Sequence, residues 1–472
     1  METEYDVVVI GGGAVAENVA DRAVKGGLTA VLVEHELVGG ECSYWACMPS
    51  KALIRSGMAL RAARQLGGAR EAVTGGLDVS AVLARRDGFT QGWDDSSQVD
   101  WVSGAGIALI RGYGRLTATR QVTVTASDGA ETVLTARHAV VVSTGSDPLL
   151  PDIPGLAHAS PWTPREATSA QAAPPRLAVI GGGVVAVEMA TAYASFGTEV
   201  TVFARSGLLR GQEDFVGDLV TAGLHGLGVT IHRESPTAVA RTPAGVTVSI
   251  GDRSVEVDEV LVAAGRAPRT DDIGIEVAGI EPGRWIDVDD TLLVRGTDWL
   301  YATGDVNHRA LLTHQGKYQA RAAGDAIAAR ALGRTVDDTA WGAHVATADH
   351  EAVPQVVFSV PEVASVGLTS AQATEAGYDV RVVDYDLGSV AGASLQADGY
   401  QGMARMVVDE RRRVTLGVTF VGQDVAELLQ AATIAVVGQV PLDRLWHAVP
   451  AYPTMNEIWL RLLETYGRPE PT

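Results

Sequence analysis

Cysteine is the scarcest reactive residue in this chain, because only Cys42 and Cys47 occur among its 472 residues. Lysine is almost as rare, and only three of the 37 Lys and Arg residues are lysines, at positions 25, 51 and 317. In a reducing compartment, a close cysteine pair is more often catalytic than structural. The two cysteines are therefore the first candidates for chemistry, and Lys51 stands beside them.

Several classes of partner are disfavoured by what the chain lacks. Its net charge of -20 argues against nucleic acid or an anionic membrane surface as a partner. No apolar run approaches the ~20 residues that a membrane span needs, and the N-terminal residues enter a strand without a basic, apolar signal region. We therefore expect a cytoplasmic protein, whose length predicts two to four domains.

The spacing of the two cysteines restricts the backbone between them. Residues five apart on an ideal α-helix have Cα atoms roughly 8–9 Å apart, which exceeds the ~7 Å that a disulfide can bridge. If the pair bonds, Cys42 must lie on an irregular first turn with Cys47 further along. A helix N-terminus there would also lower the pKa of a thiol. From this segment alone, the alternative is that Cys42 and Cys47 are two unrelated buried cysteines that do not act as a pair.

The first part of the chain has the pattern of a βαβ unit that binds an ADP moiety. A buried strand at residues 5–10 leads into a G-x-G-x-x-A turn, a helix over 14–26 and a second strand that ends at Glu34. The glycines of such units allow a tight turn and close phosphate approach, and the acid binds the ribose hydroxyls. The combination predicts a dinucleotide site on Gly11, Gly13, Ala16 and Glu34.

The same pattern returns roughly 170 residues later. A strand at 176–180 leads into a second G-x-G-x-x-A turn, a helix to about Phe196 and a strand over 199–203. This is an internal duplication of nucleotide-binding architecture. One dinucleotide per unit is the simplest interpretation, so we expect electron transfer between two cofactors, the second bound on Gly181, Gly183 and Ala186.

Further strands and a connector complete the predicted organisation. Short strands around 115–142 precede a proline-rich connector near residues 148–155. A later strand ends at Asp305, which can accept a sugar hydroxyl or simply cap the following helix. From about residue 350, alternating apolar residues predict strands, with helices near 424–438 and 456–465.

These segments together resemble the flavoprotein disulfide reductases, a family that includes dihydrolipoamide dehydrogenase, glutathione reductase and mercuric reductase. The resemblance spans essentially the whole chain. Its most specific marks are Gly40-x-Cys42-x4-Cys47-x-Pro49-Ser50-Lys51, Thr144-Gly145-Ser146, Gly265-Arg266-x-Pro268, Thr303-Gly304-Asp305 and the run from Phe358 to Thr369.

The resemblance implies an α/β fold with two Rossmann-like FAD- and NAD(P)-binding domains and a C-terminal α+β dimerisation domain. Its expected parts are an FAD-binding domain in two segments, an NAD(P)-binding domain between them and an interface domain that forms a homodimer with a shared active site. The predicted boundaries are 1–150 and 271–345 for FAD, 151–270 for NAD(P) and 346–472 for the interface.

The resemblance also implies roles for individual residues. Electrons would pass from a nicotinamide nucleotide through FAD to the Cys42–Cys47 disulfide and on to a thiol/disulfide-type or other small-molecule substrate. Cys47 would be the thiol next to the flavin, Cys42 the interchange thiol, and Lys51 would lie by flavin N5 and pair with Glu188. FAD would be bound by Gly11, Gly13, Ala16, Glu34, Gly40, Gly114, Thr144, Gly145, Gly304 and Asp305, and the nicotinamide nucleotide by Gly181, Gly183, Ala186, Arg205, Arg210 and Gly265.

The second nucleotide unit favours NADPH over NADH. NADH-using relatives place an acid at the end of the second strand of this unit, for the ribose hydroxyls. Here the strand ends in Phe203-Ala204-Arg205-Ser206, and Arg210 follows closely. No carboxylate repels a 2′-phosphate, and two guanidinium groups can bind it bidentately. The alternative is that Arg205 and Arg210 are solvated loop residues that bind no phosphate.

The chain departs from the family near its C-terminus. Where glutathione reductase has a His-Pro-Thr-x-x-Glu run with a catalytic histidine, this chain has Tyr452 to Glu457. A phenol with a reference pKa near 10 is a poorer base at neutral pH than imidazole near 6.5. Tyr452 and Glu457 are the candidates at this position, and His447 is an alternative base.

The substrate is therefore open. Mercuric reductase also has this tyrosine, but the chain lacks its vicinal C-terminal cysteines and its N-terminal metal-binding domain, and we expect no metal site. A quinone or another acceptor that bypasses the thiols is a further alternative, as is a dihydrolipoamide dehydrogenase-like reaction. Between the cysteines, Tyr44 and Trp45 could offer a flat face to an aromatic acceptor or pack in the core.

Overall fold

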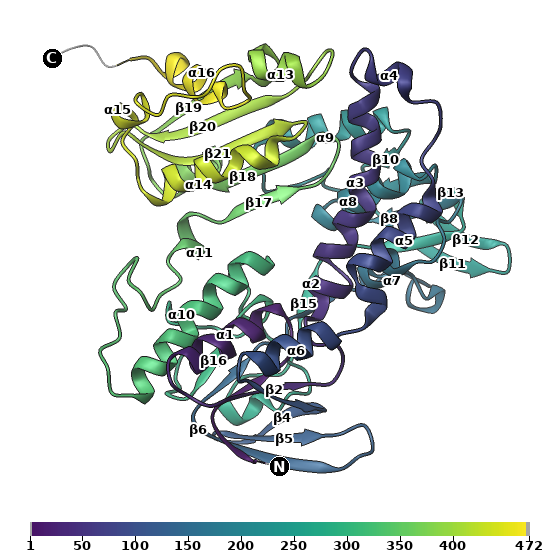
Figure 1. Ribbon diagram of the computed structural model, residues 1–472. Helices are drawn as coiled ribbons and strands as arrows, with labels where there is room; N and C mark the ends of the chain where they lie inside the picture. The colour runs from purple at the N-terminus through teal and green to yellow at the C-terminus, as the bar shows by residue number, and fades with distance from the viewer. Residues whose placement is uncertain (1, 469–472) are drawn as a thin grey trace. The chain divides into compact units, whose positions relative to one another are not determined.

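Helices alternate with parallel strands in the two nucleotide-binding sheets, and an antiparallel sheet with helices follows them, which confirms the α/β class predicted from the sequence. The computed structural model describes residues 2–468, and its elements are labelled in Figure 1. Contacts within the chain divide it into two compact units. The first unit contains the chain up to Pro49 with residues 86–149 and 266–350, and the second contains residues 50–85, 150–265 and the chain from Glu351 on.

A seven-stranded sheet forms the core of the first unit. Its order is β3-β2-β1-β6-β5-β4, with β16 also paired to β6. Val8 pairs in parallel with Val31 on one side and Val140 on the other, and all three are fully buried. Burial on both faces explains the continuous valine runs of these strands. Their bounds are β1 (Glu4–Ile10), β2 (Ala30–Glu34), β3 (Ala108–Arg111), β4 (Tyr113–Ala118), β5 (Gln121–Thr125), β6 (Glu131–Val142) and β16 (Leu300–Ala302).

Two helices of the first unit, α1 (Ala14–Lys25) and α10 (Thr313–Ala331), pack closely against each other and lie side by side in Figure 1. Their contact is rich in alanine, and Ala20, Ala320 and Ala323 are fully buried. Residues more than 290 positions apart in the sequence are therefore neighbours. The remaining elements of this unit are α2 (Gly40–Tyr44), η1 (Gln91–Trp93), α6 (Ser96–Gly104), β7 (Ser146–Pro148), β15 (Arg266–Pro268), η3 (Ile275–Ala278), η4 (Asp305–Asn307) and α11 (Ala348–Glu351).

Buried amide and carboxyl groups fix α10 to the turn that follows β16. Gln319 Oε1 accepts hydrogen bonds from the amide of Gly304 and from Asn307 Nδ2, both at 2.9 Å. Gln319 Nε2 donates to Asp349 Oδ2 at 2.9 Å, and Gln315 donates to Asp349 Oδ1 at 2.8 Å. Because these groups are buried, losing one partner would leave another polar group unsatisfied. The N-terminal half of α10 is thus held in one position.

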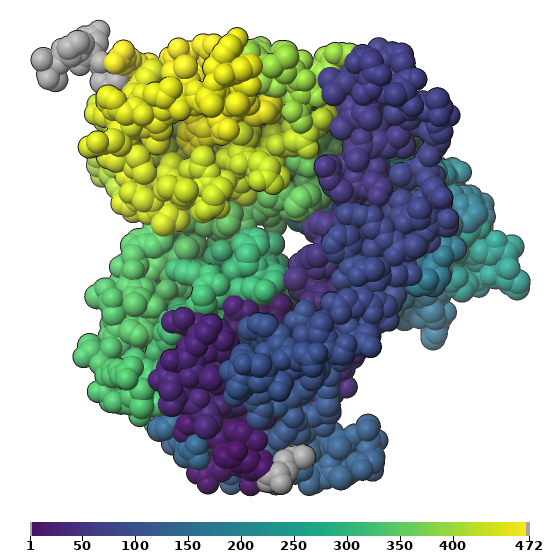
Figure 2. All heavy atoms as spheres, in the orientation of Figure 1, coloured from purple at the N-terminus to yellow at the C-terminus, as the bar shows by residue number. Residues whose placement is uncertain are grey.

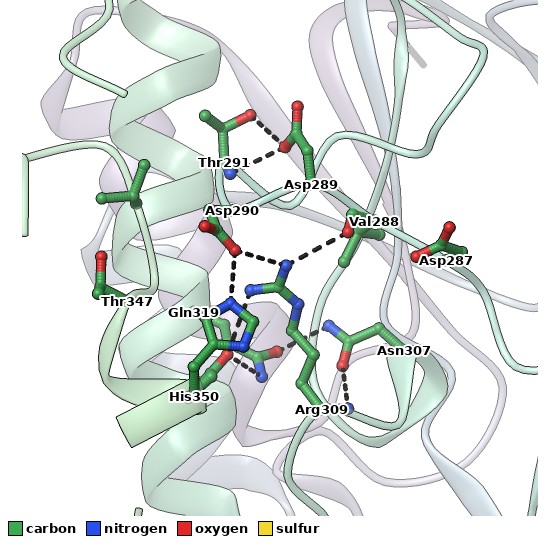
Figure 3. A network of polar contacts seen from close by, with 12 residues as sticks. Asp287, Val288, Asp289, Asp290, Thr291, Asn307, Arg309, Gln319, Thr347 and His350 are labelled. Atoms are coloured by element: carbon green, nitrogen blue, oxygen red, sulfur yellow. Dashed lines mark hydrogen bonds and ion pairs between the residues drawn. The ribbon is translucent and has the colours of Figure 1, made fainter. Parts of the chain in front are cut away.

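An ion-pair network extends this cluster, as Figure 3 shows. Arg309 donates to Asp290 Oδ1 at 2.7 Å and to the carbonyl of Val288 at 3.2 Å. His350 Nε2 lies 2.8 Å from the same oxygen of Asp290. The network joins the loop before β16, the turn after it and the short helix α11.

The second unit contains a parallel four-stranded sheet of order β10-β9-β8-β14 and an antiparallel sheet of three strands. Leu53 and Ile54 of the long helix α3 share a buried cluster with Val179 of β8 and Val187 of α8. The bounds are β8 (Arg176–Ile180), β9 (Glu199–Phe203), β10 (Thr230–His232), β14 (Glu259–Val262), β11 (Ala238–Thr242), β12 (Gly245–Ile250), β13 (Arg253–Val257), η2 (Ala157–Ala159), α3 (Cys47–Arg64), α4 (Ala69–Ala72), α5 (Val79–Phe89), α7 (Pro164–Ser169), α8 (Val184–Ser195) and α9 (Asp214–Gly226).

The C-terminal part of this unit is an antiparallel five-stranded sheet, β17-β18-β21-β20-β19, covered by helices. In the space-filling view its last elements, drawn in yellow, pack into one continuous mass (Figure 2). The bounds are β17 (Pro354–Val357), β18 (Glu362–Gly367), β19 (Val380–Asp386), β20 (Met403–Asp409), β21 (Val414–Gly422), α12 (Ser370–Glu375), η5 (Leu387–Ser389), α13 (Ala391–Gln396), η6 (Val425–Leu428), α14 (Leu429–Val437), α15 (Leu442–Leu445) and α16 (Glu457–Tyr466).

Residues 58–110 are mostly helical and end in the short strand β3. β3 pairs with β2 through Ala108 and Val31, and a four-residue strand leaves little periodicity to detect. The division into an FAD-binding domain of two segments, an NAD(P)-binding domain and an interface domain stays a prediction.

None of the helices within residues 2–468 combines the length and apolar character that crossing a membrane requires.

Candidate functional site

The first glycine-rich turn lies between β1 and α1. Gly11 has a φ of +106°, and a Cβ atom there would lie 2.5 Å from the carbonyl oxygen of Ser143, so only glycine fits. Gly13 begins α1, and a Cβ on it would meet only the Cα of Gly40, 4.0 Å away. The helix N-terminus thus opens onto free space bordered by backbone, the arrangement that a pyrophosphate requires. Ala16 is fully buried behind the turn.

Glu34 stands at the end of β2, beside this turn. Its Oε2 accepts a hydrogen bond from the amide of Gly12 at 2.6 Å, and its Oε1 accepts from the amide of Glu36 at 2.7 Å. Backbone donors on both oxygens fix the orientation of the carboxylate, which is the acceptor that ribose hydroxyls need. The glycine turn and Glu34 together fit the ADP moiety of FAD.

The ends of β6 and β16 contribute to the same edge of the sheet. Thr144 donates to the carbonyl of Arg269 at 2.8 Å, and Gly145 has open space where a Cβ would be. Ser146 donates to Asp305 Oδ2 at 2.6 Å. Parallel strands bind ligands beyond their carboxyl ends, so the predicted flavin-binding residues share one edge. Gly304 precedes Asp305, whereas Gly114 lies within β4 against Ile10 and Val33.

The helix that carries Cys42 stops before Cys47. Trp45 has φ −135° and ψ −3°, outside the helical region, and α3 begins at Cys47. The amides of Trp45 and Ala46 both donate to the carbonyl of Glu41, at 2.9 and 2.6 Å. The backbone between the thiols is therefore irregular, as the geometry of a bonded pair requires.

The two thiols face each other at the start of α10. Neither is in a disulfide, both are partly buried, and Cys47 Sγ shares a hydrogen bond with Thr313 Oγ1 at 3.3 Å. The hydrogen bond to Cys47, burial and the charge of Cys47 raise the pKa of the Cys42 thiol. Thr313 and the ammonium group of Lys317 act in the opposite direction. Both belong to the first turns of α10, where the helix dipole also favours a thiolate.

The residues around Cys42 have defined partners. Glu41 forms an ion pair with Arg269 at 3.1 Å, and Arg269 also binds Asp147 at 2.6 Å. Tyr44 is only 3% exposed, so it packs in the core and offers no open face to an acceptor. Trp45 is half-buried and meets the Tyr44 ring edge-on, with centroids 5.7 Å apart.

The second glycine-rich turn repeats the first, in the second unit. A Cβ on Gly181 would lie 2.2 Å from the carbonyl oxygen of Ala263, whereas Gly183 has nothing within 4 Å. Gly183 caps α8, and Ala186 is fully buried. The turn is therefore open at the helix N-terminus, which fits a second pyrophosphate. Gly265, in the loop after β14, has a φ of +144°.

Arg205 and Arg210 belong to the loop that borders this turn. The amide of Leu209 donates to the carbonyl of Gly182 at 2.7 Å, which fixes the loop against the glycines. Both arginine side chains are exposed, and within residues 2–468 neither has an ion-pair partner. Two uncompensated guanidinium groups thus flank the proposed phosphate-binding turn.

Lys51, which is half-buried, forms an ion pair with the buried Glu188 in the second unit. Lys51 Nζ lies 2.7 Å from Glu188 Oε2, and the amide of Phe358 donates to Glu188 Oε1 at 3.1 Å. Glu188 is only 3% exposed. The ammonium also lies 5.2 Å from the centre of the Phe358 ring. The Glu188 carboxylate, itself held by the Phe358 amide, and the face of the Phe358 ring position Lys51, one helical turn after Cys47 on α3.

The C-terminal candidates differ in exposure. Tyr452 is 76% exposed and His447 is exposed, whereas Glu457 is buried at the start of α16. Glu457 Oε1 accepts from Arg461 at 2.5 Å, and its Oε2 has no hydrogen-bond partner within residues 2–468. Tyr452 and Glu457, the two C-terminal candidates, are therefore not hydrogen-bonded to each other within the described part of one chain.

Sequence reasoning missed three residues: Thr313 and Lys317, which act on the thiol pair, and Glu17, which interacts with Lys317 and Tyr44. Thr313 and Glu17 gave no signal, and Lys317 was noticed only as a rare lysine. They come from α1 and α10, and only the packing of these helices brings them to the cysteine segment. Within residues 2–468, no three His, Cys, Asp or Glu side chains form a group that could hold a metal ion.

Two family models match the chain. The model of the pyridine nucleotide-disulphide oxidoreductases matches residues 5–325, and the model of the dimerisation domain of the same enzymes matches residues 353–462. The matches cover both glycine-rich turns, the cysteine pair and the C-terminal sheet.

Curated relatives and solved structures are similar over nearly the whole chain. Mercuric reductase from Acidithiobacillus ferrooxidans is 30% identical over 98% of this chain and 83% of its own length. Dihydrolipoyl dehydrogenase from Bacillus subtilis is 29% identical over 98% of this chain and 96% of its own length. The HOCl-induced flavoprotein disulfide reductase RclA from Escherichia coli, in a Cu(II) complex, superposes with a TM-score of 0.84 at 22% identity over 98% and 99%. LpdA from Mycobacterium tuberculosis superposes with a TM-score of 0.83 at 23% sequence identity, over 99% of this chain and 100% of its own length.

The open space at Gly183 predicts a selective loss of nucleotide binding. A Cβ atom on Gly183 has no neighbour within 4 Å, so we expect Gly183→Val to keep the fold while its side chain fills the space in front of α8. We expect the dissociation constant for the nicotinamide nucleotide to rise about tenfold or more, which is ~1.4 kcal/mol. Calorimetric titration measures it, and Gly226→Val, also without neighbours within 4 Å, is the control. Unchanged affinity in Gly183→Val would contradict this assignment.

Proposed function

Because this chain belongs to the pyridine nucleotide-disulphide oxidoreductase family, we propose that it oxidises NADPH and reduces the Cys42–Cys47 disulfide, and through it a thiol/disulfide-type substrate. The family consists of FAD-dependent enzymes that use pyridine nucleotides. The observation that carries the proposal is the facing pair of thiols beside α10, in the unit that also contains the first nucleotide turn.

Each cofactor has a proposed set of binding residues. FAD, when bound, supplies a carrier that takes two electrons from the nicotinamide and returns them to a disulfide. The open turn, the oriented Glu34 carboxylate and the carboxyl ends of β6 and β16 support its binding in the first unit. The proposed FAD residues are Gly11, Gly13, Ala16, Glu34, Gly40, Gly114, Thr144, Gly145, Gly304 and Asp305, and the nicotinamide nucleotide is assigned to Gly181, Gly183, Ala186, Arg205, Arg210 and Gly265.

The chain's own residues supply the thiol chemistry. In the reduced pair Cys47 is the electron-rich sulfur, because Thr313 and the N-terminus of α10 stabilise negative charge on it. Cys42 is the thiol that attacks the substrate, and the raised pKa of its thiol means that it needs help to ionise. Lys51, held by Glu188, supplies a fixed positive charge on the same helix as Cys47.

NADPH is the proposed reductant. The exposed Arg205 and Arg210 flank the second glycine turn, and β9 ends without an acidic residue. A 2′-phosphate carries charge that a guanidinium binds through two parallel hydrogen bonds. A ribose hydroxyl, by contrast, has no carboxylate partner at this position.

A homodimer is the proposed assembly, and the scarcity of cysteine fits a reducing cytoplasm. The C-terminal sheet matches the family's dimerisation domain. Around it, Ile434, Val449 and Tyr452 are 60%, 84% and 76% exposed, which is unusual for apolar and aromatic side chains unless a partner covers them. Tyr452 and Glu457 are proposed to act on the active site of the second copy.

Replacing Cys42 distinguishes disulfide chemistry from direct electron transfer to an acceptor. We expect Cys42→Ser to abolish turnover with NADPH and a disulfide substrate, because the serine hydroxyl cannot form the mixed disulfide. Turnover with a quinone should persist, since it needs no thiol. Steady-state oxidation of NADPH with each acceptor measures both. Disulfide turnover that survives in Cys42→Ser would sink the proposal.

Mercuric ion is the second acceptor to compare. Several curated relatives are named mercuric reductase, but this chain has only two cysteines. NADPH oxidation that depends on Hg(II) in excess thiol, at rates above those with disulfides, would assign that reaction instead.

Removing the two arginines tests the choice of nucleotide. In Arg205→Ala/Arg210→Ala we expect the dissociation constant for NADPH to rise at least tenfold, because a hydrogen bond to a charged group is worth about 1.5–3 kcal/mol. The constant for NADH should change less than twofold. Arg233→Ala, which breaks an exposed pair with Asp218, is the control. Equal effects on both nucleotides would contradict the assignment.

A further inference from the structure

The three lysines of this chain have different environments. Lys25 is exposed and pairs with Asp21 at 2.8 Å, and Lys51 pairs with the buried Glu188. Lys317 is half-buried, and within residues 2–468 no carboxylate lies within ion-pair distance of its ammonium group. A lysine without a partner, in a chain that otherwise uses arginine, suggests a purpose other than surface charge.

Lys317 lies beside the thiol pair. It follows Thr313 by one turn of α10, and Thr313 bonds to Cys47. The positive charge of Lys317 lowers the pKa of the Cys42 thiol and also that of the Glu17 carboxyl. Its ammonium group therefore acts on both residues at once.

Glu17 is the second unusual charge in this cluster. It belongs to α1, is only 6% exposed, and its Oε1 has no hydrogen-bond partner within residues 2–468. Burial raises the pKa of its carboxyl to about 7, against the lowering effect of Lys317. A buried carboxylate without a donor is costly, so its presence next to Lys317 needs an explanation beyond packing.

We propose that Lys317 and Glu17 are positioning residues that together set the ionisation of the Cys42 thiol, in a chain that has Tyr452 where glutathione reductase has a catalytic histidine. The ammonium group of Lys317 stabilises the Cys42 thiolate. The Glu17 carboxylate offsets part of that positive charge. This inference deepens the proposed function and rests on Cys42 being the thiol that attacks the substrate.

The step is an ionisation and moves no electrons. Cys42 S–H loses its proton to water and becomes the thiolate, and the same charge on Lys317 stands on both sides of the equation. Below neutral pH Glu17 is protonated and Lys317 acts fully on the sulfur. Above it Glu17 is ionised, opposes the thiolate and spreads the titration of Cys42 over a wider pH range.

Other charged and titratable groups pack around this cluster and act together with the pair. The pKa of Tyr44 is raised to about 12, by burial first and then by Asp95 and Glu17, so its phenol stays neutral in the working range. The Glu34 carboxylate is held by backbone amides. The groups of other elements that act on the pair are Cys42 and Tyr44 of α2, Cys42 through Lys317 and Tyr44 through Glu17.

Site-resolved alkylation tests the proposal on the FAD-loaded enzyme. The protein is reduced with excess dithiothreitol, freed of reductant, and treated with iodoacetamide from pH 5 to 10, and mass spectrometry follows Cys42 separately from Cys47. Lys317→Met should raise the apparent pKa of Cys42 by about one unit and slow its alkylation about tenfold at pH 7, as loss of one nearby charge predicts. Glu17→Gln should shift the pKa downward and speed alkylation at pH 8.

Controls separate charge from structure. Lys317→Arg should keep the wild-type profile, and Lys25→Met should leave it unchanged. Lys317→Gln and Glu17→Gln test the two charges independently, so a folding defect in one variant leaves the other decisive. Profiles within twofold of wild type in Lys317→Met and Lys317→Gln, or slower alkylation in Glu17→Gln, would overturn the proposal. Because dithiothreitol supplies the electrons, the result does not depend on whether NADPH reduces the disulfide.

Discussion

The break between α2 and α3 is the constraint on which the chemistry of this molecule depends. A continuous helix would hold Cys42 and Cys47 too far apart to bond, whereas the non-helical Trp45 lets the two sulfurs face each other. Because α3 starts at the second cysteine and α10 at Thr313, helix N-termini favour a thiolate at the pair. The two sulfurs differ in their neighbours, and the proposed division of labour between them follows from that difference.

The duplicated nucleotide turns give this pair a source of electrons. Gly11 and Gly181, which begin the two turns, are too crowded for a side chain, whereas Gly13 and Gly183 open onto free space. The arrangement is the same, but the neighbours differ: Glu34 is fixed beside the first turn, and two uncompensated arginines flank the second. In the proposed assignment, the turn itself supplies the phosphate site, and the residues at the end of one strand distinguish the cofactor that each turn binds.

Local sequence patterns predicted what lies close in the chain and missed what tertiary packing assembles. The glycine turns, Glu34 and the irregular cysteine turn follow from spacing, because each depends on a few consecutive residues. Lys317 and Glu17 are 300 positions apart and meet only because α1 packs on α10. The partner of Glu41 was equally hidden, since Arg269 reaches it from a distant loop. Tyr44 carried no mark in the sequence to show that it is buried.

Anaerobic titration of the FAD-loaded enzyme with NADPH tests the central claim most directly, with the flavin spectrum followed at each addition. Electron transfer to a working Cys42–Cys47 disulfide predicts a long-wavelength band from the Cys47 thiolate against the flavin after two electrons, before the flavin itself bleaches. Bleaching straight to reduced flavin without that band would contradict the account, because it would mean that the electrons never reach the cysteine pair.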